Sequence, residues 1–212
     1  MIDNIHWYGH DSFRIDGSCT VYIDPWKLPP GAPPADVVLV THAHYDHFSA
    51  ADIAAVATPQ TIVVGPASVT GELRGRRAVT ISAGQTLTAG TATVTAVPAY
   101  NLDKFRSRGE PYHPREAGGL GYILEMDGRR IYHAGDTDAV PEMREVRCDI
   151  ALLPVGGTYT MTAAEAADAC VLIAAATVIP MHFGDIVGTG ADAERLRSLC
   201  ATPVVILTPE GR

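Results

Sequence analysis

The chain has few cysteines and few aromatic residues, and it lacks a long apolar run. Only four of its 212 residues are cysteines, and Cys19, Cys148, Cys170 and Cys200 are scattered without a paired short spacing. That scatter does not indicate a zinc knuckle or a disulfide framework, so we expect reduced thiols. No apolar run reaches the ~20 residues that span a bilayer, and the first residues do not resemble a signal peptide. We therefore expect a cytoplasmic protein that does not enter a membrane.

Basic residues are also scarce. The chain has 16 lysines and arginines against 24 aspartates and glutamates, a formal net charge of -8 at pH 7. A surface that holds a nucleic-acid backbone usually needs a basic face, so we expect a small-molecule substrate and no nucleic-acid partner. The length fits a single domain over residues 1–212, and a homo-oligomer is left open.

One stretch is rich in groups that bind metals. His42, His44, Asp46 and His47 directly follow the apolar run 37–40. Each polar group placed there costs free energy unless it is satisfied, and a metal ion would satisfy all of them. In an extended chain His42 and His44 project to the same side, so they can share one cation. Asp46 and His47 follow where the chain turns, so the stretch predicts one metal site and suggests a second.

The remaining pattern consists of short strands with single helices between some of them. We expect strands at 5–8, 12–15, 20–23, 37–40, 62–64, 79–81, 85–87, 91–97, 120–126, 130–133, 149–153, 178–181 and 204–207, with those from 79 to 97 antiparallel. We expect helices at 50–57, 67–74, 141–147, 162–175 and 192–200. Ser49 and Asp192 are the predicted N-caps of two helices, and Thr162 with Glu165 forms a capping-box pattern. Two sheets with helices outside would bury both strand sets.

The segment from Pro98 to Gly119 shows no periodicity. A loop of that length in a compact domain is more often a functional lid or a disordered segment than a plain connector. It contains Asn101, Lys104, three arginines and His113. We treat it as a candidate substrate loop.

Two further residues lie at the ends of predicted strands. Asp136 and His182 each follow a strand, as His42 and His44 do. Ligand sites in open sheets assemble at the shared edge formed by the carboxyl ends of strands. Alone, Asp136 would be interpreted as a turn carboxylate after glycine, and His182 as a hydrogen-bonded histidine. Together with the histidine-rich stretch, they predict one composite site.

These motifs resemble those of the metallo-β-lactamase superfamily of metal-dependent hydrolases. The signature His-x-His-x-Asp-His is matched by residues 42–47, the later aspartate by Asp136 and the last histidine by His182. More narrowly, the segments 9–13, 23–25 and 132–137 are similar to the branch that includes ascorbate-phosphate lactonases and the phospholipase D that releases N-acyl ethanolamines. The resemblance covers nearly the whole chain. It implies an α/β fold, specifically a four-layer αββα sandwich of two mixed sheets flanked by helices.

The resemblance also implies two divalent cations. His42, His44 and His113 would hold the first, and Asp46, His47 and His182 the second, with Asp136 bridging them. Zinc is preferred, while manganese, iron and nickel are also compatible with these ligands. The family expects another histidine where this chain has Asn101. We expect His113 to fill that position in preference to Asn101 or water, because an amide is a poor replacement for imidazole on zinc.

The implied chemistry is hydrolysis of a small-molecule ester or lactone by a metal-bound hydroxide. Asp46 could orient or deprotonate the water, and His10 and His133 are candidates to assist catalysis without binding metal. Asp24 is a candidate acceptor that fixes the tautomer of a ligand histidine. One alternative is a phosphodiesterase or nuclease of the same fold, which would need a basic rim from the arginines of residues 104–115. Another is a metal-binding protein without hydrolytic activity.

Overall fold

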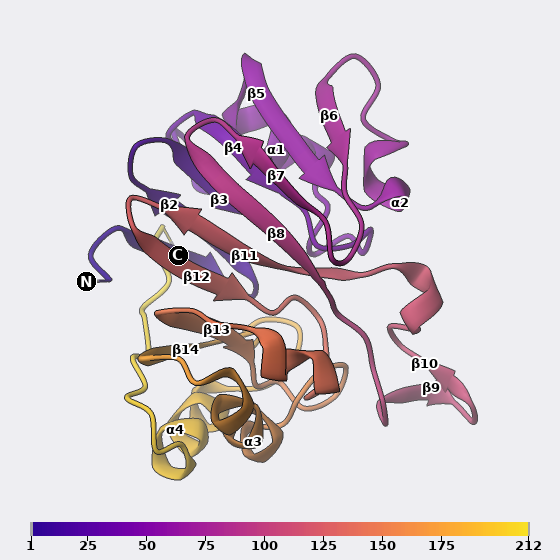
Figure 1. Cartoon of the computed structure of the whole chain (residues 1–212), viewed down its shortest axis with the longest axis vertical. Helices are drawn as coiled ribbons and strands as arrows, with labels where there is room; N and C mark the ends of the chain where they lie inside the picture. The colour runs from indigo at the N-terminus through magenta and orange to yellow at the C-terminus, as the bar shows by residue number, and fades with distance from the viewer. Residues whose placement is uncertain (1, 212) are drawn as a thin grey trace.

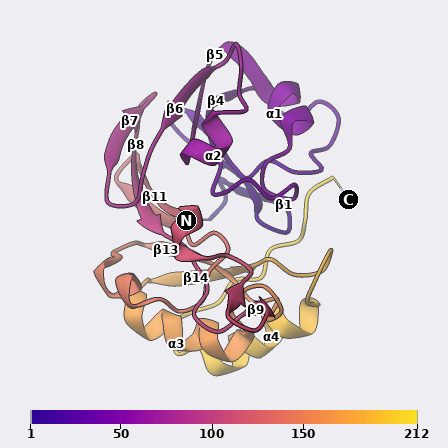
Figure 2. The same cartoon turned by 90° about the vertical axis from the view of Figure 1, so that its right-hand side faces the viewer.

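The computed structural model describes residues 2–211, which form two six-stranded sheets packed face to face (Figure 1). Helices α1 (Ala50–Val56) and α2 (Ala67–Thr70) lie on the outer side of one sheet. Helices α3 (Ala163–Ile173) and α4 (Gly190–Leu199) cover the outer side of the other sheet (Figure 2). The order of layers is therefore helix, sheet, sheet, helix, which confirms the predicted αββα sandwich. Within this part of the chain, no helix is both long enough and apolar enough to span a membrane.

The first sheet contains the first six strands in sequence order. They are β1 (Ile5–Gly9), β2 (Ser12–Asp16), β3 (Thr20–Ile23), β4 (Ala35–Leu39), β5 (Ala57–Gly65) and β6 (Arg77–Thr80). Strands β1 to β3 form an antiparallel meander, whereas β3 to β6 are parallel. The prediction that the strand near residue 79 is antiparallel is wrong. A crossover through α2 separates β5 from β6, and such connections join parallel strands.

The second sheet has the order β14-β13-β12-β11-β8-β7. Its strands are β7 (Thr86–Ala89), β8 (Ala92–Pro98), β11 (Leu120–Met126), β12 (Arg129–His133), β13 (Ile150–Pro154) and β14 (Thr177–Met181). The predicted hairpin between β11 and β12 is confirmed, and its turn residues Asp127 and Gly128 have φ angles of 53° and 74°. Strands β12, β13 and β14 are parallel, so their carboxyl ends meet at one edge. Asp136 and His182 follow two of these ends.

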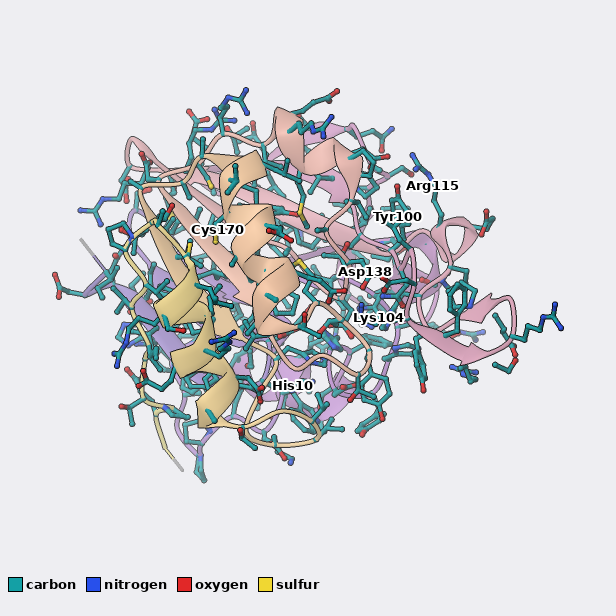
Figure 3. The ribbon with its side chains drawn as sticks, turned by 90° about the horizontal axis from the view of Figure 1, so that it is seen from below. His10, Tyr100, Lys104, Arg115, Asp138 and Cys170 are labelled. Atoms are coloured by element: carbon teal, nitrogen blue, oxygen red, sulfur yellow. The ribbon has the colours of Figure 1, made fainter. Side chains whose placement is uncertain are left out.

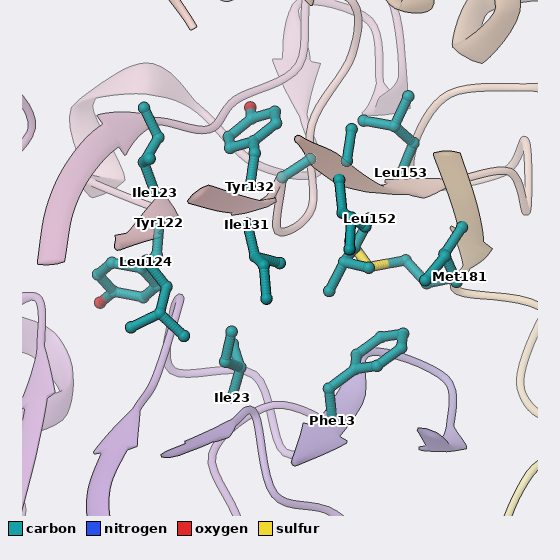
Figure 4. Close-up of a cluster of buried hydrophobic side chains, with 14 of the residues drawn as sticks. Phe13, Ile23, Tyr122, Ile123, Leu124, Ile131, Tyr132, Leu152, Leu153 and Met181 are labelled. Atoms are coloured by element: carbon teal, nitrogen blue, oxygen red, sulfur yellow. The ribbon is translucent and has the colours of Figure 1, made fainter. Parts of the chain in front are cut away.

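The core lies between the two sheets. In Figure 4, Phe13 and Ile23 of the first sheet face Leu124, Ile131 and Leu152 of the second, and all five side chains are buried. Neighbouring residues of the second sheet point to the opposite face, as the two-residue period of a strand requires. Each buried side chain of this size contributes about 1.5–3 kcal/mol to stability. This packing fixes the relative position of the two sheets, and therefore of the loops at their shared edge.

Local capping signals account for the starts of α1, α3 and α4. The Ser49 hydroxyl accepts a hydrogen bond from the Asp52 N–H, and Thr162 and Glu165 form both bonds of a capping box, as predicted. The N-cap of helix α4 lies three residues before the predicted cap. Its N-cap is Thr189, and Asp192 occupies the third helical position, where its carboxylate accepts from the Thr189 N–H. The Asp192 prediction was wrong because either residue type can cap a helix, and the capping-box spacing from Thr189 decides between them.

Three other predicted segments differ from the structure. Residues 141–145 form a 3-10 helix rather than an α-helix, and the predicted strand at 204–207 is reduced to one bridge between Val178 and Val204. The segment 98–119 is not structureless. It contains a two-stranded hairpin, β9 (Phe105–Ser107) and β10 (Glu110–Pro111), which projects from the body of the protein in Figure 1.

Candidate metal centre

The histidine-rich stretch lies in the turn between β4 and α1. The His44 carbonyl accepts hydrogen bonds from the N–H groups of His47 and Phe48, which closes the turn. Helix α1 starts shortly afterwards and holds the far end of the turn. His42, His44, Asp46 and His47 are thereby presented at the sheet edge where β4 ends.

The first cluster of ring nitrogens joins His42, His44 and His113. The His44 Nδ1 atom lies 3.0 Å from His42 Nε2 and 3.2 Å from His113 Nε2. Three imidazoles that converge in this way could hold one cation. The structure thus brings His113 beside His42 and His44, although it follows them by about 70 positions in the chain.

Asn101 orients His113 and does not join this cluster itself. Its Oδ1 atom accepts hydrogen bonds from the His113 main-chain N–H at 2.8 Å and from His113 Nδ1 at 3.0 Å. Its Nδ2 group donates to the Tyr159 carbonyl and to Asp138 Oδ1 at 2.9 and 3.3 Å, and these two acceptors define the orientation of the amide. Because the proton of His113 is then on Nδ1, the lone pair of Nε2 faces His42 and His44.

Asp24 and Thr41 orient two other histidines. Asp24 Oδ2 accepts from the Thr41 hydroxyl at 2.6 Å and from His47 Nδ1 at 2.7 Å, which confirms the expected contact between Asp24 and a candidate ligand. The Thr41 oxygen in turn lies 3.0 Å from His42 Nδ1 and can accept its proton. Both histidines therefore turn Nε2 towards other candidate ligands, with His42 Nε2 3.0 Å from His44 Nδ1 and His47 Nε2 3.4 Å from Asp136 Oδ1.

Two further clusters share His47 and His182. One adds His10 and Asp46, and the other adds Asp11 and Asp136. Asp136 also lies close to the first cluster, so it connects the two sides of the site. Its Oδ2 atom is 3.2 Å from His113 Nε2 and 3.3 Å from His182 Nε2, and its Oδ1 atom is 3.4 Å from His47 Nε2.

Several polar atoms of these clusters have no hydrogen-bond partner. Among residues 2–211, the buried atoms without a partner include ring nitrogens or carboxylate oxygens of His10, Asp11, His47, Asp136 and His182. Native proteins rarely leave such groups unsatisfied, because each one costs free energy. Imidazole nitrogens and carboxylate oxygens are the ligands that zinc and other divalent transition metals take. The residues present therefore fit a metal centre.

The protonation equilibria in the cluster depend strongly on one another. Burial disfavours the charged form of His47, but the carboxylates of Asp136 and Asp24 outweigh it and raise the pKa of His47 well above 6.5. Burial likewise opposes ionisation of Asp136, yet the neighbouring histidines hold its pKa well below 3.8. Burial and the Asp136 carboxylate raise the pKa of Asp11 well above 3.8. Bound cations would add positive charge beside the carboxylates of this cluster.

The two histidines expected to assist catalysis are placed differently. His10 Nε2 lies 3.1 Å from Asp46 Oδ2, and burial lowers the pKa of His10 to about 4, so neutral His10 can donate to this carboxylate. His133 Nε2 donates to the Asp11 carbonyl, and its Nδ1 accepts from the Gly135 N–H. With both nitrogens bonded to the main chain, His133 supports the turn before Asp136.

Asp11 is the cluster residue that sequence reasoning missed. Its side chain is fully buried, and its Oδ2 atom lies 3.6 Å from His47 Nδ1. Asp11 follows His10 in the tight β1–β2 turn, where a surface aspartate is the usual interpretation. The available signal was its position inside the motif 9–13, next to a histidine and between two apolar strands.

A cavity of about 260 Å³ opens over the clusters. Candidate ligands from both sheets form part of its wall. It is lined by His44, Tyr45, Asp46, Arg106, Tyr112, His113, Asp136, Tyr159, His182 and Ile186. A small molecule in this cavity would therefore contact several candidate metal ligands directly.

The basic side chains of the 104–115 segment do not form a basic rim. Lys104 Nζ lies 2.7 Å from Glu165 Oε1 and 3.7 Å from Asp138 Oδ1, and Figure 3 shows Lys104 beside Asp138. Arg115 pairs with Glu142 at 2.7 Å and stacks on the Tyr100 ring. Among the lysines and arginines within residues 2–211, the one that lines the cavity is Arg106.

Comparison with known sequences identifies the family of this chain. Residues 4–182 match the family described as the β-lactamase superfamily domain. A "UPF0173 metal-dependent hydrolase" from Methanoculleus marisnigri is 37% identical over 183 residues, which cover 84% of this chain and 79% of the relative. Another protein with this description, from Thermoplasma acidophilum, is 34% identical over 220 residues, which cover 97% of this chain and 95% of that protein.

Solved structures show the same fold. A metal-dependent hydrolase from Parabacteroides distasonis superposes with a TM-score of 0.82 at 33% identity, covering 95% of this chain and 91% of that one. A metallo hydrolase from Ignicoccus hospitalis superposes with a TM-score of 0.77 at 24% identity, covering 97% and 94% of the two chains. At that lower identity the likeness concerns the fold alone.

Proposed function

This chain belongs to the metallo-β-lactamase superfamily and is a metal-dependent hydrolase, and from that premise we propose that it hydrolyses a small-molecule ester or lactone. In this proposal, His42, His44 and His113 hold one divalent cation, and Asp46, His47 and His182 hold a second. Asp136, whose two oxygens lie near His113, His182 and His47, would contribute to both sites. The nitrogen-rich ligand set supports zinc in particular.

Bound cations of this kind activate water and stabilise the negative charge that develops on the substrate. The residues of the chain prepare the site for this chemistry. Burial raises the pKa of Asp46, but the hydrogen bond from His10 and the nearby His47 outweigh it and leave the pKa below 3.8, so Asp46 is ionised near neutral pH. Its carboxylate borders the cavity and can accept a hydrogen bond from a water molecule there. His10 keeps that carboxylate oriented by donating from Nε2.

The main support for the proposal is that buried nitrogen and oxygen atoms without hydrogen-bond partners lie beside an open cavity. Asp136 and His182 each have such an atom, and both residues line the cavity. A purely structural metal site is normally closed by protein ligands on every side. The access seen at this centre therefore favours catalysis over metal storage or scaffolding.

The cavity also favours a small molecule over nucleic acid. A protein that follows a nucleic-acid backbone neutralises several phosphates with lysines and arginines. Here Lys104 and Arg115 are engaged by carboxylates, which leaves Arg106 at the cavity wall. The phosphodiesterase or nuclease alternative is therefore less well supported than an ester or lactone hydrolase.

The test combines metal analysis with a substrate panel. We expect the purified protein to bind two equivalents of a divalent metal and, when loaded, to hydrolyse acyl esters or lactones faster than phosphodiesters. The double variant His42→Ala, Asp136→Ala should lose both the metal and the activity. Activity that survives in this variant would show that the chemistry occurs elsewhere, and preferential phosphodiester hydrolysis would refute the substrate class.

A further inference from the structure

The cavity beside the metal centre has an aromatic wall that ends in one positive charge. The Tyr159 ring lies 6.5 Å from the His182 ring and packs edge-to-face on Tyr112, with ring centroids 4.8 Å apart. The Arg106 guanidinium lies 5.9 Å from the Tyr112 ring centroid. His182, Tyr159, Tyr112 and Arg106 thus follow one another along the cavity wall.

The main chain that carries Arg106 is held by its hairpin, while the Arg106 side chain itself is exposed. The base of the hairpin is closed by main-chain hydrogen bonds from Asn101 N–H to the His113 carbonyl and from Tyr112 N–H to the Lys104 carbonyl. Lys104 in turn is anchored to Glu165 of α3. The strand that carries Arg106 is thus attached to the same segment that delivers His113, so the distance between the arginine and the metal centre is constrained.

The charge of Arg106 is not neutralised by the protein. Within residues 2–211, no carboxylate forms an ion pair with it, whereas Lys104 and Arg115 each have such partners. A guanidinium presents several N–H donors in a plane that matches the oxygens of a carboxylate or phosphate. An arginine that lines a substrate-sized cavity without an acidic partner is well suited to bind an anionic group of the substrate.

We propose that Arg106 is a specificity-determining residue that binds an anionic group of the substrate, with Tyr112 and Tyr159 packing against an apolar spacer between that group and the scissile bond. This inference rests on the proposed ester or lactone hydrolysis and names its substrate class. The substrate is a small ester or lactone that bears a carboxylate or a phosphate away from the reacting carbonyl. A cavity of about 260 Å³ limits it to a compact molecule.

The test uses matched esters and matched arginine variants of the metal-loaded protein. The neutral probe is phenyl acetate, and the anionic probes are the acetate esters of para-hydroxybenzoate and of para-hydroxyphenyl phosphate. Arg106→Gln is compared with Arg106→Lys and with Arg108→Gln. Arg108 is exposed in the same hairpin but does not line the cavity, so its variant removes an equal charge without touching the site.

We expect Arg106→Gln to lower kcat/KM for an anionic ester by about 10-fold through a higher KM, the factor typical of losing one charged hydrogen bond. Hydrolysis of phenyl acetate should not change, Arg106→Lys should retain part of the preference, and Arg108→Gln should match the wild type. The anionic ester whose kcat/KM falls more in Arg106→Gln shows whether Arg106 binds a carboxylate or a phosphate. Equal effects of Arg106→Gln and Arg108→Gln, or an equal loss on the neutral ester, would overturn the inference.

A binding measurement separates this inference from the hydrolysis proposal. We expect calorimetric titration to show that para-hydroxybenzoate or para-hydroxyphenyl phosphate binds about 10-fold more weakly to Arg106→Gln than to the wild type and Arg108→Gln. If no ester is hydrolysed, the proposed function fails, and this difference in affinity still supports the anion site. If both anions bind all three proteins equally, the anion site is refuted whether or not esters are hydrolysed.

Discussion

Replacing Asn101 tests how the metal centre is assembled. Asn101 occupies the position where relatives of this fold are expected to carry a ligand histidine, yet its amide oxygen holds His113 in place through the ring Nδ1 and the main-chain N–H. Asn101→Ala removes that acceptor and also the Nδ2 donor to Tyr159 and Asp138. Asn101→Asp removes the same donor but keeps an oxygen that can accept from His113.

The expected magnitudes follow from these contacts. Losing the partner that orients a metal-binding histidine typically weakens metal affinity about 10- to 100-fold, or about 1.4–2.8 kcal/mol. Asn101→Ala also leaves the buried His113 N–H and the Tyr159 carbonyl without this partner, at about 1–3 kcal/mol each. Asn101→Asp places a carboxylate beside Asp138 and should also be destabilised. Metal affinity, rather than stability, is therefore the quantity that distinguishes the two variants.

The assay is a metal titration of both variants and the wild type, followed by calorimetry and by cobalt(II) absorption spectra. We expect Asn101→Ala to lose affinity at one of two sites and to change the cobalt spectrum, while Asn101→Asp stays close to the wild type. The reasoning would be refuted if both variants lost affinity equally, because the retained acceptor would then have no effect. Wild-type affinity in Asn101→Ala would also contradict it.

Three other predictions address the ligands and the loop that carries them. His113→Ala should reduce metal affinity at one site by more than Asn101→Ala does, and unchanged stoichiometry and affinity would exclude His113 as a ligand. Removing the metal with a chelator should lower the Tm, and restoring the metal should raise the Tm again. The expected stabilisation is about 2.7 kcal/mol at a metal concentration 100 times Kd. A Tm that does not respond to metal would argue against metal binding by the folded state. Burial raises the pKa of Glu165, but the hydrogen bonds from Lys104 and Thr162 outweigh burial and hold this pKa below 4.5. The ionised form of Glu165 therefore stabilises the fold above pH 4.5. This contribution is lost as the pH falls through the lower pKa of the folded state. Urea unfolding of Glu165→Gln should accordingly show a deficit of about 1 kcal/mol or less at neutral pH that shrinks in acid, and a deficit independent of pH would contradict the assignment.

Signals that depend on residues close together in the chain were predicted well. The turn at Asp127 and Gly128, the capping box of α3 and the cap at Ser49 were found because each involves a few neighbouring residues with a specific backbone geometry. The N-cap of α4 was misplaced by three residues because Thr189 and Asp192 can each cap a helix. The orientation of β6 was mispredicted because strand pairing depends on how α2 crosses the sheet, which hydrophobic alternation does not encode.

The sequence by itself determined the class of this protein, a metal-dependent hydrolase of the metallo-β-lactamase superfamily. The motif containing His42, His44, Asp46 and His47, with Asp136 and His182 at later strand ends, indicated a metal centre because few other arrangements satisfy so many buried imidazoles and carboxylates. Only the tertiary structure decided which distant groups complete it. Asp11 joins the cluster, Asn101 orients His113, and Arg106 lines the cavity while Lys104 turns to Glu165. The reason is physical: ligand spacing within one turn follows from local backbone geometry, whereas these contacts depend on how two sheets and a long loop pack together.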